Sequence, residues 1–418
     1  MSLLTSTDRF AAFRHVSYTR FFFARFLVSF AAQIISVSVG WQMYDQTGSA
    51  IYLGLIGLVQ FLPSLVLTLV TGSVADRYSR RHIVAICTLV GALCAVALWV
   101  MTATGSFAPL PVFLILTVMG IERAFLGPAT QSLAPNLVPP EDLSNAVAWN
   151  SSSWQTAAIV GPVAGGLLYG VGPSLAYAVA AIFSILGAIL IQMIAKPAQH
   201  STGMATNWNT ILAGYRFIWS EKVVLGAISL DLFAVLLGGA VALMPIFARD
   251  ILTLGPWGLG LLRAAPGVGA IATAVLLATY PLRHRAGIYM FAGVAMFGVG
   301  TLLFGLSETP WLSIVALMIM GASDMISVYV RETLIALWTP DHVRGRVNAV
   351  NMVFVGASNE LGEFRAGTMA SLFGAVPAVV IGGVGTLAVA IIWAIGFPQL
   401  RKIDTLDAPE PEGAAKPV

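Results

Sequence analysis

The sequence predicts an all-α membrane protein with twelve transmembrane helices in two pseudo-symmetric six-helix bundles. Three observations support this prediction. Of the 418 residues, 58% are hydrophobic and only 10% are charged, which excludes an ordinary soluble domain. Apolar stretches of about 20 residues or more, the length that crosses a bilayer, recur along the whole chain. The chain also repeats itself at an offset near 202 residues.

Each apolar stretch is too long for a strand, so a helix is expected in each one. The expected spans are 20–44, 52–75, 82–103, 110–133, 144–169, 173–195, 223–248, 256–280, 286–306, 311–337, 346–372 and 376–397. The first stretch lacks a small-residue cleavage site and exceeds the length of a signal peptide, so we expect it to be retained.

Lysine and arginine set the expected orientation. Outside the spans they gather before the first span, between spans 2 and 3, 6 and 7, 8 and 9, and 10 and 11, and after the last span, whereas Arg249 stands alone on the other side. Cytoplasmic loops hold the excess of positive charge. We therefore expect a multi-pass protein of the inner (plasma) membrane with both termini in the cytoplasm.

The internal repeat predicts the domain organisation. Met119-Gly120 in the fourth span corresponds to Met320-Gly321 in the tenth, and Pro139 then corresponds to Pro340 without a gap. Six-span parallel repeats are typical of one large class of transporters, with the substrate site near the midplane. The repeat predicts an N-terminal bundle over 1–200 and a C-terminal bundle over 223–400.

Two further segments complete the chain. Residues 201–222 are expected as a linker and an interfacial helix, because apolar residues recur at helical spacing from Trp208 to Ile218. Residues 401–418 are rich in Pro and Ala and are expected as a disordered cytoplasmic tail.

Charged residues fall inside some spans and are missing from others. They are Arg25, Glu122, Arg123, Asp231, Arg263, Asp324, Arg331, Glu332, Glu360, Glu363 and Arg365. A charge at the centre of a membrane helix costs about 2.5–3.5 kcal/mol. Spans 3, 6, 9 and 12 hold none, so we expect them to face lipid while the others surround a central passage.

Two groups of candidate site residues follow. Glu360 and Glu363 share one helix face, and two like charges at low dielectric make good candidates for exchanging a proton, as does Asp324 at mid-span. We therefore expect these three to couple transport to protons. A substrate cavity is expected on spans 1, 4, 7 and 10. Its expected contacts are Trp41, Gln42, Glu122, Arg123 and Arg331.

A purely structural role is the alternative for several of these residues. Arg331 with Glu332, and Glu122 with Arg123, are candidates for ion pairs that only hold helices together. For Arg25 and Asp231, which lie nearer the cytoplasmic side, a structural role is expected, and for Arg263 both roles stay open. Trp41 and Gln42 also fit an anchor at the membrane interface.

The sequence excludes other classes of function. Its five histidines lie in loops or tails without the spacing of metal ligands, and no nucleophile motif is present. No Gly-rich phosphate loop with a lysine is present, which excludes an ATP-driven pump. We expect no enzyme activity, no metal, no cofactor and no nucleic-acid partner.

Two motifs resemble those of the major facilitator superfamily. GSVADRYSRR (72–81) matches the pattern G-x-x-x-D-[RK]-x-x-[RK]-[RK] of its loop between spans 2 and 3, and GPVAGG (161–166) resembles its span-5 antiporter motif. TPDHVRGRVNAV (339–350) and SNELGEFRAG (358–367) are similar to the subgroup of the enterobactin exporter and macrolide efflux proteins. The residues expected to act in conformational change are Gly72, Asp76, Arg77, Arg80, Arg81, Gly161, Pro162, Gly165 and Gly166.

The resemblance implies the major facilitator fold and a secondary exporter. Such a protein would export small amphiphilic molecules of the drug or siderophore class by alternating access, as a monomer, with protons as the antiported ion. The second-half counterpart of the loop motif, TYPLRHRAG (279–287), lacks its aspartate, so the two cytoplasmic loops are not expected to be equivalent. A proton-coupled importer on the same fold and a non-transporting membrane receptor are the alternatives.

Overall fold

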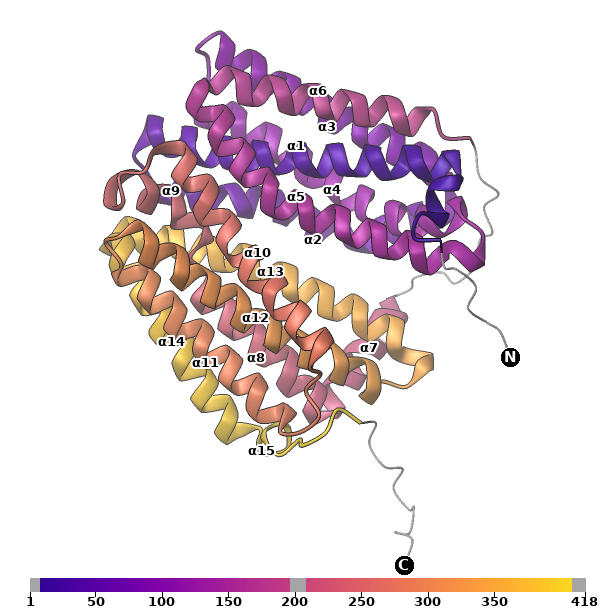
Figure 1. Cartoon of the computed structure of the whole chain (residues 1–418), viewed down its shortest axis with the longest axis vertical. Helices are drawn as coiled ribbons and strands as arrows, with labels where there is room; N and C mark the ends of the chain where they lie inside the picture. The colour runs from indigo at the N-terminus through magenta and orange to yellow at the C-terminus, as the bar shows by residue number, and fades with distance from the viewer. Residues whose placement is uncertain (1–7, 196–207, 408–418) are drawn as a thin grey trace, which may run out of the picture. The chain divides into compact units, whose positions relative to one another are not determined.

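The computed structural model describes residues 8–195 and 208–407, and helices dominate both ranges (Figure 1). The helices of the first half are α1 (Val16–Thr47), α2 (Ala50–Arg77), α3 (Arg80–Ala103), α4 (Pro109–Leu133), α5 (Leu143–Val171) and α6 (Pro173–Gln192). Those of the second half are α7 (Trp208–Ser220), α8 (Lys222–Gly238), α9 (Met244–Ile246), α10 (Gly255–Thr279), α11 (Ala286–Leu306), α12 (Pro310–Trp338), α13 (Asp341–Phe373), α14 (Ala375–Gly396) and α15 (Pro398–Arg401). Short 3₁₀ or π turns are η1 (Ala11–Arg14), η2 (Ala134–Leu137), η3 (Pro140–Asp142), η4 (Val241–Leu243) and η5 (Phe247–Ile251).

The predicted all-α membrane fold is confirmed. Every predicted span except 223–248 coincides with one long helix, and the predicted helix that starts at Trp208 is α7. Within the described residues, ten helices are long and apolar enough to cross a membrane, and α5 and α13 are not among them. Both contain polar stretches: the first half of α5 holds a run of Trp, Asn, Ser and Gln, and α13 contains the charged stretch 358–367. Polar membrane helices are tolerated where they face a cavity or other helices.

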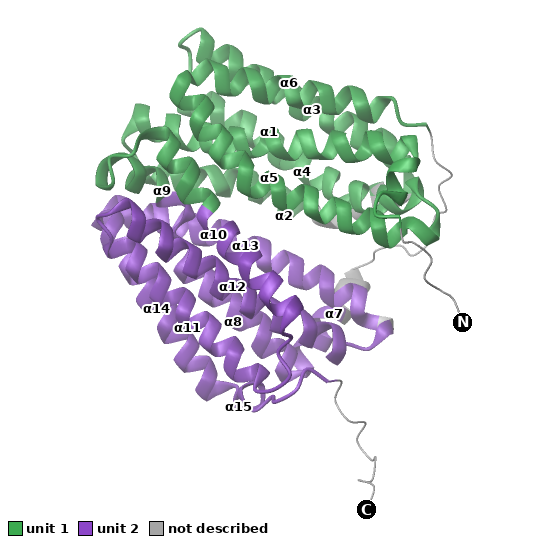
Figure 2. Cartoon of the chain, viewed as in Figure 1, with its two compact units in different colours: residues 1–206, 244–264 green, residues 207–243, 265–418 purple. Residues whose placement is uncertain are grey.

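The chain divides into two compact units (Figure 2). Unit 1 comprises residues 1–206 and 244–264, and unit 2 comprises residues 207–243 and 265–418. Unit 1 therefore holds α1 to α6 together with α9, η5 and the first turns of α10. The segment 244–264 was expected in the C-terminal bundle, so the division in space does not follow the repeat in the sequence at this point.

The Met-Gly pairs that revealed the repeat mark close helix crossings. A Cβ at Gly120 of α4 would overlap the Gln60 carbonyl oxygen of α2, and a Cβ at Gly321 of α12 would overlap the Pro266 carbonyl oxygen of α10. Small residues let membrane helices approach until their backbones touch. The repeat in the sequence is thus a repeat of one packing contact, made once in each unit.

The helices predicted to face lipid expose apolar side chains. Each of α3, α6, α11 and α14 has large apolar residues on its surface, and on α14 the exposed fractions reach 62% at Ile391 and 72% at Ile395. The opposite faces of these helices are buried, as Leu98 of α3 and Phe304 of α11 show. This distribution is the one expected for helices with one side against acyl chains.

Helix α8 ends at Gly238, inside the span predicted over 223–248, so the single helix expected there is interrupted. Three donors satisfy carbonyls of its last turn. The Arg365 guanidinium donates to the Leu237 carbonyl, the Thr386 hydroxyl to that of Ala234 at 3.0 Å, and the Gly239 N–H to that of Val235 at 3.0 Å. A cation is favourable at a helix C-terminus, and unsatisfied carbonyls are costly in a membrane. Arg365 therefore has a structural role.

Replacing Arg365 by leucine is expected to destabilise unit 2 by about 1–3 kcal/mol, because a buried carbonyl of α8 loses its donor. Thermal unfolding of the purified protein in detergent measures the change. Arg365→Lys keeps a cation near the helix end and should lose less. An unchanged unfolding temperature for Arg365→Leu would contradict the capping role.

Residues 401–407 differ from the disordered tail that the sequence predicted from residue 401 onwards; residues 408–418 lie outside the described part. The N–H groups of Ala286 and Gly287 donate to the carbonyls of Asp404 and Ile403, both at 3.0 Å. The Asp404 carboxylate accepts from the Arg285 N–H at 2.9 Å and lies 3.1 Å from the His284 ring. The hydrogen bond from His284 lowers the pKa of Asp404. This segment caps the start of α11, a role that composition alone does not reveal.

Candidate functional site

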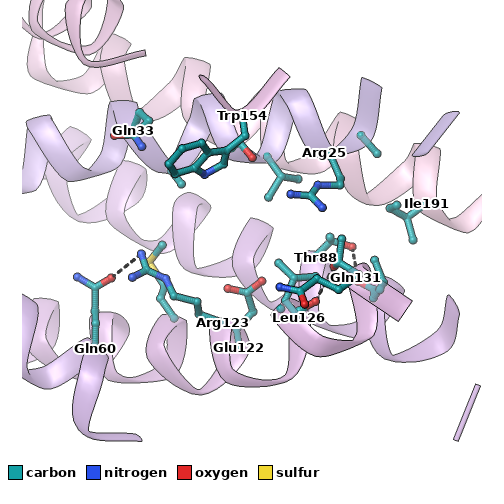
Figure 3. A pocket seen from close by; sticks show the side chains of 18 residues that line it. Arg25, Gln33, Gln60, Thr88, Glu122, Arg123, Leu126, Gln131, Trp154 and Ile191 are labelled. Carbon is teal, nitrogen blue, oxygen red and sulfur yellow. Dashed lines mark hydrogen bonds between the residues drawn. The ribbon is translucent and has the colours of Figure 1, made fainter. Parts of the chain in front are cut away.

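Unit 1 encloses a cavity of about 530 Å³ among its helices (Figure 3). Its polar and aromatic lining residues are Arg25, Ser29, Gln33, Gln60, Thr88, Glu122, Arg123, Thr130, Gln131 and Trp154. Helices α1 and α4 supply most of the wall, as expected, while α2, α3, α5 and α6 each add at least one residue. The sequence had assigned the third and sixth spans to lipid contact only, so that assignment is too simple for α3 and α6.

Helical periodicity places the polar groups on the cavity side. On α1, Arg25, Ser29 and Gln33 follow one another at intervals of four residues and form one stripe. On α4, two adjacent rows of residues line the cavity. One row begins at Glu122 and the other at Arg123, and each also includes the residues four and eight positions further along the helix. Polar stripes on helices that are otherwise apolar are expected where a helix borders a wet space.

Glu122 and Arg123 both line this cavity, and among the described residues they do not form an ion pair with each other. Arg123 donates to the Gln60 side chain over 3.5 Å. Within the described residues, Glu122 makes no ion pair or hydrogen bond. It lies beside Gly91 of α3 and also borders a smaller apolar pocket of about 280 Å³ that Ile86, Cys87 and other apolar residues line.

Trp41 and Gln42 are not among the residues that line this cavity, and their contact with a substrate stays a prediction. Both are buried, with 8% and 5% of their surface exposed, and the Gln42 side chain accepts a hydrogen bond from Thr102 at 3.3 Å. The sequence overlooked Gln33, Gln60, Gln131 and Trp154, and had assigned Arg25 to structure. The signal that could have found three of the α1 residues is the spacing of Arg25, Ser29 and Gln33.

Arg331 belongs to a buried ion pair of unit 2. Its guanidinium binds the Asp231 carboxylate, and the two side chains are 4% and 8% exposed. Arg331 Nε lies 3.6 Å from Glu332 Oε1, which also accepts from Asn351 at 3.1 Å. Asp231 is therefore the main partner of Arg331, and a place for Arg331 in a substrate cavity stays a prediction.

The three residues predicted to couple protons lie in different surroundings. Asp324 faces a small space between α8, α11 and α12 that also touches Asp231, Val294, Phe297 and Ser327. Glu360 and Glu363 lie one turn apart on the continuous helix α13, are half-buried and each have an interaction partner. The structure therefore does not bring Asp324 into the same site as the two glutamates in any contact that it describes.

The loop-motif arginines bind the ends of neighbouring helices. Arg80 donates to the Ser132 carbonyl near the end of α4, and Arg81 donates to the Gln192 carbonyl at the end of α6. Arg77 is exposed. The surroundings of Gly72 and of the Asp76 side chain are outside the described part of the structure. Cations at helix C-termini are favourable, so Arg80 and Arg81 stabilise the ends of α4 and α6 in unit 1.

The GPVAGG motif lies at two close helix contacts. A Cβ at Gly161 would come 2.6 Å from the Gln33 side chain of α1, and one at Gly165 would come 3.0 Å from Ile34. Gly166 meets Gly260 of α10, with 3.2 Å between the added Cβ and the Gly260 Cα. Pro162 lies inside α5. The motif thus lets α5 contact both α1 and the start of α10.

A polar contact, here called the α1–η5 latch (Tyr44, Asp45, Arg249 and Asp250), joins α1 to the segment 244–264. The Tyr44 hydroxyl donates to Asp250 at 2.5 Å, and Arg249 Nη2 lies 3.2 Å from Asp45 Oδ1. Arg249 is the basic residue that stood alone in the loops opposite the cytoplasmic side. Its role is to bind α1.

The double variant Tyr44→Phe, Arg249→Gln should loosen the segment 244–254 from α1. Half-exposed polar pairs of this kind contribute about 1 kcal/mol, so amide exchange in the segment should rise about fivefold. Hydrogen–deuterium exchange with mass spectrometry measures it, and α11 of unit 2 is the internal control. Equal exchange in both proteins would contradict a latch.

Comparisons with known proteins agree on the class. The family described as transmembrane secretion effector matches residues 7–415. The enterobactin exporter of Citrobacter koseri is 23% identical over 407 residues, with 96% of each chain covered, and that of Escherichia coli O1:K1 is 24% identical over 395 residues, with 93% of each covered.

Solved structures show the same fold. A bacterial homolog of the human lysosomal transporter Spinster has a TM-score of 0.71 at 14% identity and covers 93% of this chain and 96% of its own. A bacterial homologue of the iron transporter ferroportin has a TM-score of 0.67 at 14% identity and covers 93% of this chain and 99% of its own. The homologues and the fold are those of transporters and not of enzymes, as the sequence predicted. The chain therefore belongs to the transmembrane secretion effector family of the major facilitator superfamily and is a multi-pass membrane transporter.

Proposed function

We propose that this protein is a secondary active exporter of small amphiphilic molecules, of the drug or siderophore class, that works by alternating access with proton antiport. The observation that supports it most is the cavity of unit 1, which combines charged and amide side chains with apolar walls inside a membrane-spanning bundle. The full-length similarity to enterobactin exporters supports export over import.

The cavity has the size and chemistry for such a substrate. Pockets for drug-sized ligands have volumes of about 300–1,000 Å³ and are mainly apolar with a few polar groups that orient the ligand. The cavity of about 530 Å³ falls within this range. Amides such as Gln33, Gln60 and Gln131 can donate and accept hydrogen bonds, which suits substrates that carry several polar groups.

Two kinds of helix contact, one tightly packed and one easily separated, support alternating access. Backbone-to-backbone crossings at Gly120 and Gly321 make each unit stiff. In the α1–η5 latch, by contrast, the ion pair of Arg249 with Asp45 is half-exposed and costs little to separate. We propose that the latch opens and closes during the transport cycle while the crossings persist. We propose that both termini lie in the cytoplasm of an inner-membrane protein, because the basic residues outside the spans gather on that side.

We propose that embedded carboxyls carry the proton. Glu122 borders the cavity directly, so a proton and a substrate can compete at the same place. Glu360, Glu363 and Asp324 remain candidates in the second half. A carboxyl at this depth exchanges its proton when the surrounding space opens to water on one side and then on the other.

Transport into proteoliposomes with an imposed pH gradient tests the proposal. The panel contains drugs and siderophores, and the variants are Glu122→Gln, Glu360→Gln, Glu363→Gln and Asp324→Asn. Glu308→Gln is the matched control, because Glu308 is exposed in the connection before α12. We expect at least one of the four variants to keep downhill flux while losing its dependence on the gradient.

Two outcomes would count against it. Gradient dependence retained in all four variants would refute proton coupling through these carboxyls. No flux of any compound across a broad panel by the wild-type protein would refute the exporter itself.

A further inference from the structure

A second hollow of unit 1 shares residues with the cavity. It measures about 500 Å³, and Arg25, Gln131 and Trp154 line both spaces. Its other walls include Asn150, Ser151 and Gln155 of α5 together with residues of η2. Arg25 and Trp154 therefore lie where the two spaces meet, and a molecule that occupies either space touches them.

Arg25 differs from the other embedded arginines in having no oxygen acceptor. In the described part of the chain its guanidinium makes no hydrogen bond or ion pair, and its recorded neighbour is the Phe21 ring, 5.9 Å from the guanidinium carbon to the ring centre. By contrast, Arg123 donates to Gln60, Arg263 to Ser36, Arg331 to Asp231 and Arg365 to the Leu237 carbonyl.

A guanidinium without an acceptor is costly in free energy unless another group accepts its hydrogen bonds. A guanidinium has five N–H donors, cannot be neutralised in a protein, and is expensive inside a membrane when it is not paired. The carboxyl of the same cavity, Glu122, comes from the opposite wall and forms no ion pair with Arg25 (Figure 3). With Arg123 also present, the lining has two guanidiniums and one carboxyl, so its potential favours an anion.

Asn150 shows a second unfilled polar position at the same place. Its side-chain oxygen is buried and has no hydrogen-bond partner among the described residues. Asn150 lines the second hollow together with Arg25, whose half-buried guanidinium offers its donors to a ligand there. Buried polar groups are normally satisfied, so the unsatisfied Asn150 oxygen beside this unpaired guanidinium marks a place where polar groups lack protein partners.

We propose that Arg25 binds an oxyanion of the transported molecule, a carboxylate or a group of similar planar geometry, and that the Trp154 indole stacks on an aromatic part of it. This inference rests on the proposed function and adds the substrate class to it: aromatic amphiphilic anions. The planar fork of arginine matches two oxygens of one carboxylate, and indole is the best aromatic surface for planar groups.

Binding to the purified protein in detergent tests the proposal without requiring transport. The probes are pyrenebutyrate, its methyl ester and pyrenebutylammonium, which share one ring system and differ in charge. Fluorescence anisotropy gives their affinities for the wild type and for the variants Arg25→Gln, Arg25→Lys and Arg263→Gln. Thermal unfolding confirms that each variant is folded.

The wild type is expected to bind the carboxylate at least tenfold more tightly than the ester or the ammonium. Arg25→Gln should remove this preference while leaving the affinity for the ester unchanged. Arg25→Lys should retain part of it, because lysine keeps the charge and loses the fork. Arg263→Gln, which removes another embedded cation, should leave the preference intact. Trp154→Leu should weaken all three probes, and Trp154→Phe should restore part of the loss.

The contrary results are distinct. No preference for the carboxylate in the wild type, or an equal preference in Arg25→Gln, overturns the assignment of Arg25. The exporter proposal is decided separately by flux of the same probes in proteoliposomes, since binding with the predicted preference but without flux would overturn export and leave the binding site in place.

Discussion

Replacing Gly321 by valine is expected to prevent folding of unit 2. A Cβ at this position would overlap the carbonyl oxygen of Pro266, and a backbone atom cannot move aside as the end of a flexible side chain can. Relief requires α10 and α12 to separate along their whole contact, which costs more than the 1–3 kcal/mol of a usual overpacked site. Gly120→Val should have a similar effect on unit 1, where the obstacle is the Gln60 carbonyl.

The yield of monodisperse protein in size-exclusion chromatography measures this effect. Gly170→Val is the matched control, since it lies in helix α5 and a Cβ there would meet nothing within 4 Å. Alanine at Gly321 should be intermediate in yield. Normal yield of Gly321→Val together with an unchanged unfolding temperature would show that the crossing is not as close as described.

Replacing Arg331 by methionine should be the most destabilising change of a charged residue in unit 2. It leaves the Asp231 carboxylate, 8% exposed, without its partner. Removing one member of a buried ion pair costs about 3–5 kcal/mol, because the remaining charge is buried and uncompensated. Asp324, which lines the same small space as Asp231, adds a second carboxyl to that region. The expected result is a large fall in unfolding temperature.

The double variant Asp231→Leu, Arg331→Met distinguishes pairing from other causes. It removes both charges, so much of the lost stability should return. Arg344→Met is the control, because it breaks an ion pair on the surface. Arg344 and Asp341 are 45% and 88% exposed, so the loss of their ion pair should cost about 0–1 kcal/mol of stability. If the double variant is no more stable than Arg331→Met alone, the ion pair is not the reason for the effect.

Local sequence patterns were sufficient for the fold. Apolar runs predicted the long helices within a few residues, and for 286–306 the predicted bounds coincide with those of α11. The Met-Gly repeat pointed to two equivalent halves, and the glycines proved to be packing contacts. These features are predictable because hydropathy and helical periodicity act over one or two turns and do not depend on the partner helix.

Which charge does what was decided only by the tertiary structure. The sequence predicts no particular role for Arg365, whereas in the structure its guanidinium caps the broken end of α8, 128 positions away in sequence. Arg331 faces Asp231 across two helices, whereas Arg25, assigned to structure, lines the cavity.

The sequence by itself determined that this chain is a membrane transporter of twelve predicted spans in two related halves. The tertiary structure decided that segment 244–264 belongs with α1 and α5, and that the cavity of unit 1 is lined by residues of six helices. The physical reason is that the charged and apolar faces of a helix follow from its own sequence. The partner of a buried charge comes from another helix, and the packing of that helix depends on contacts, such as those of glycines, far along the chain.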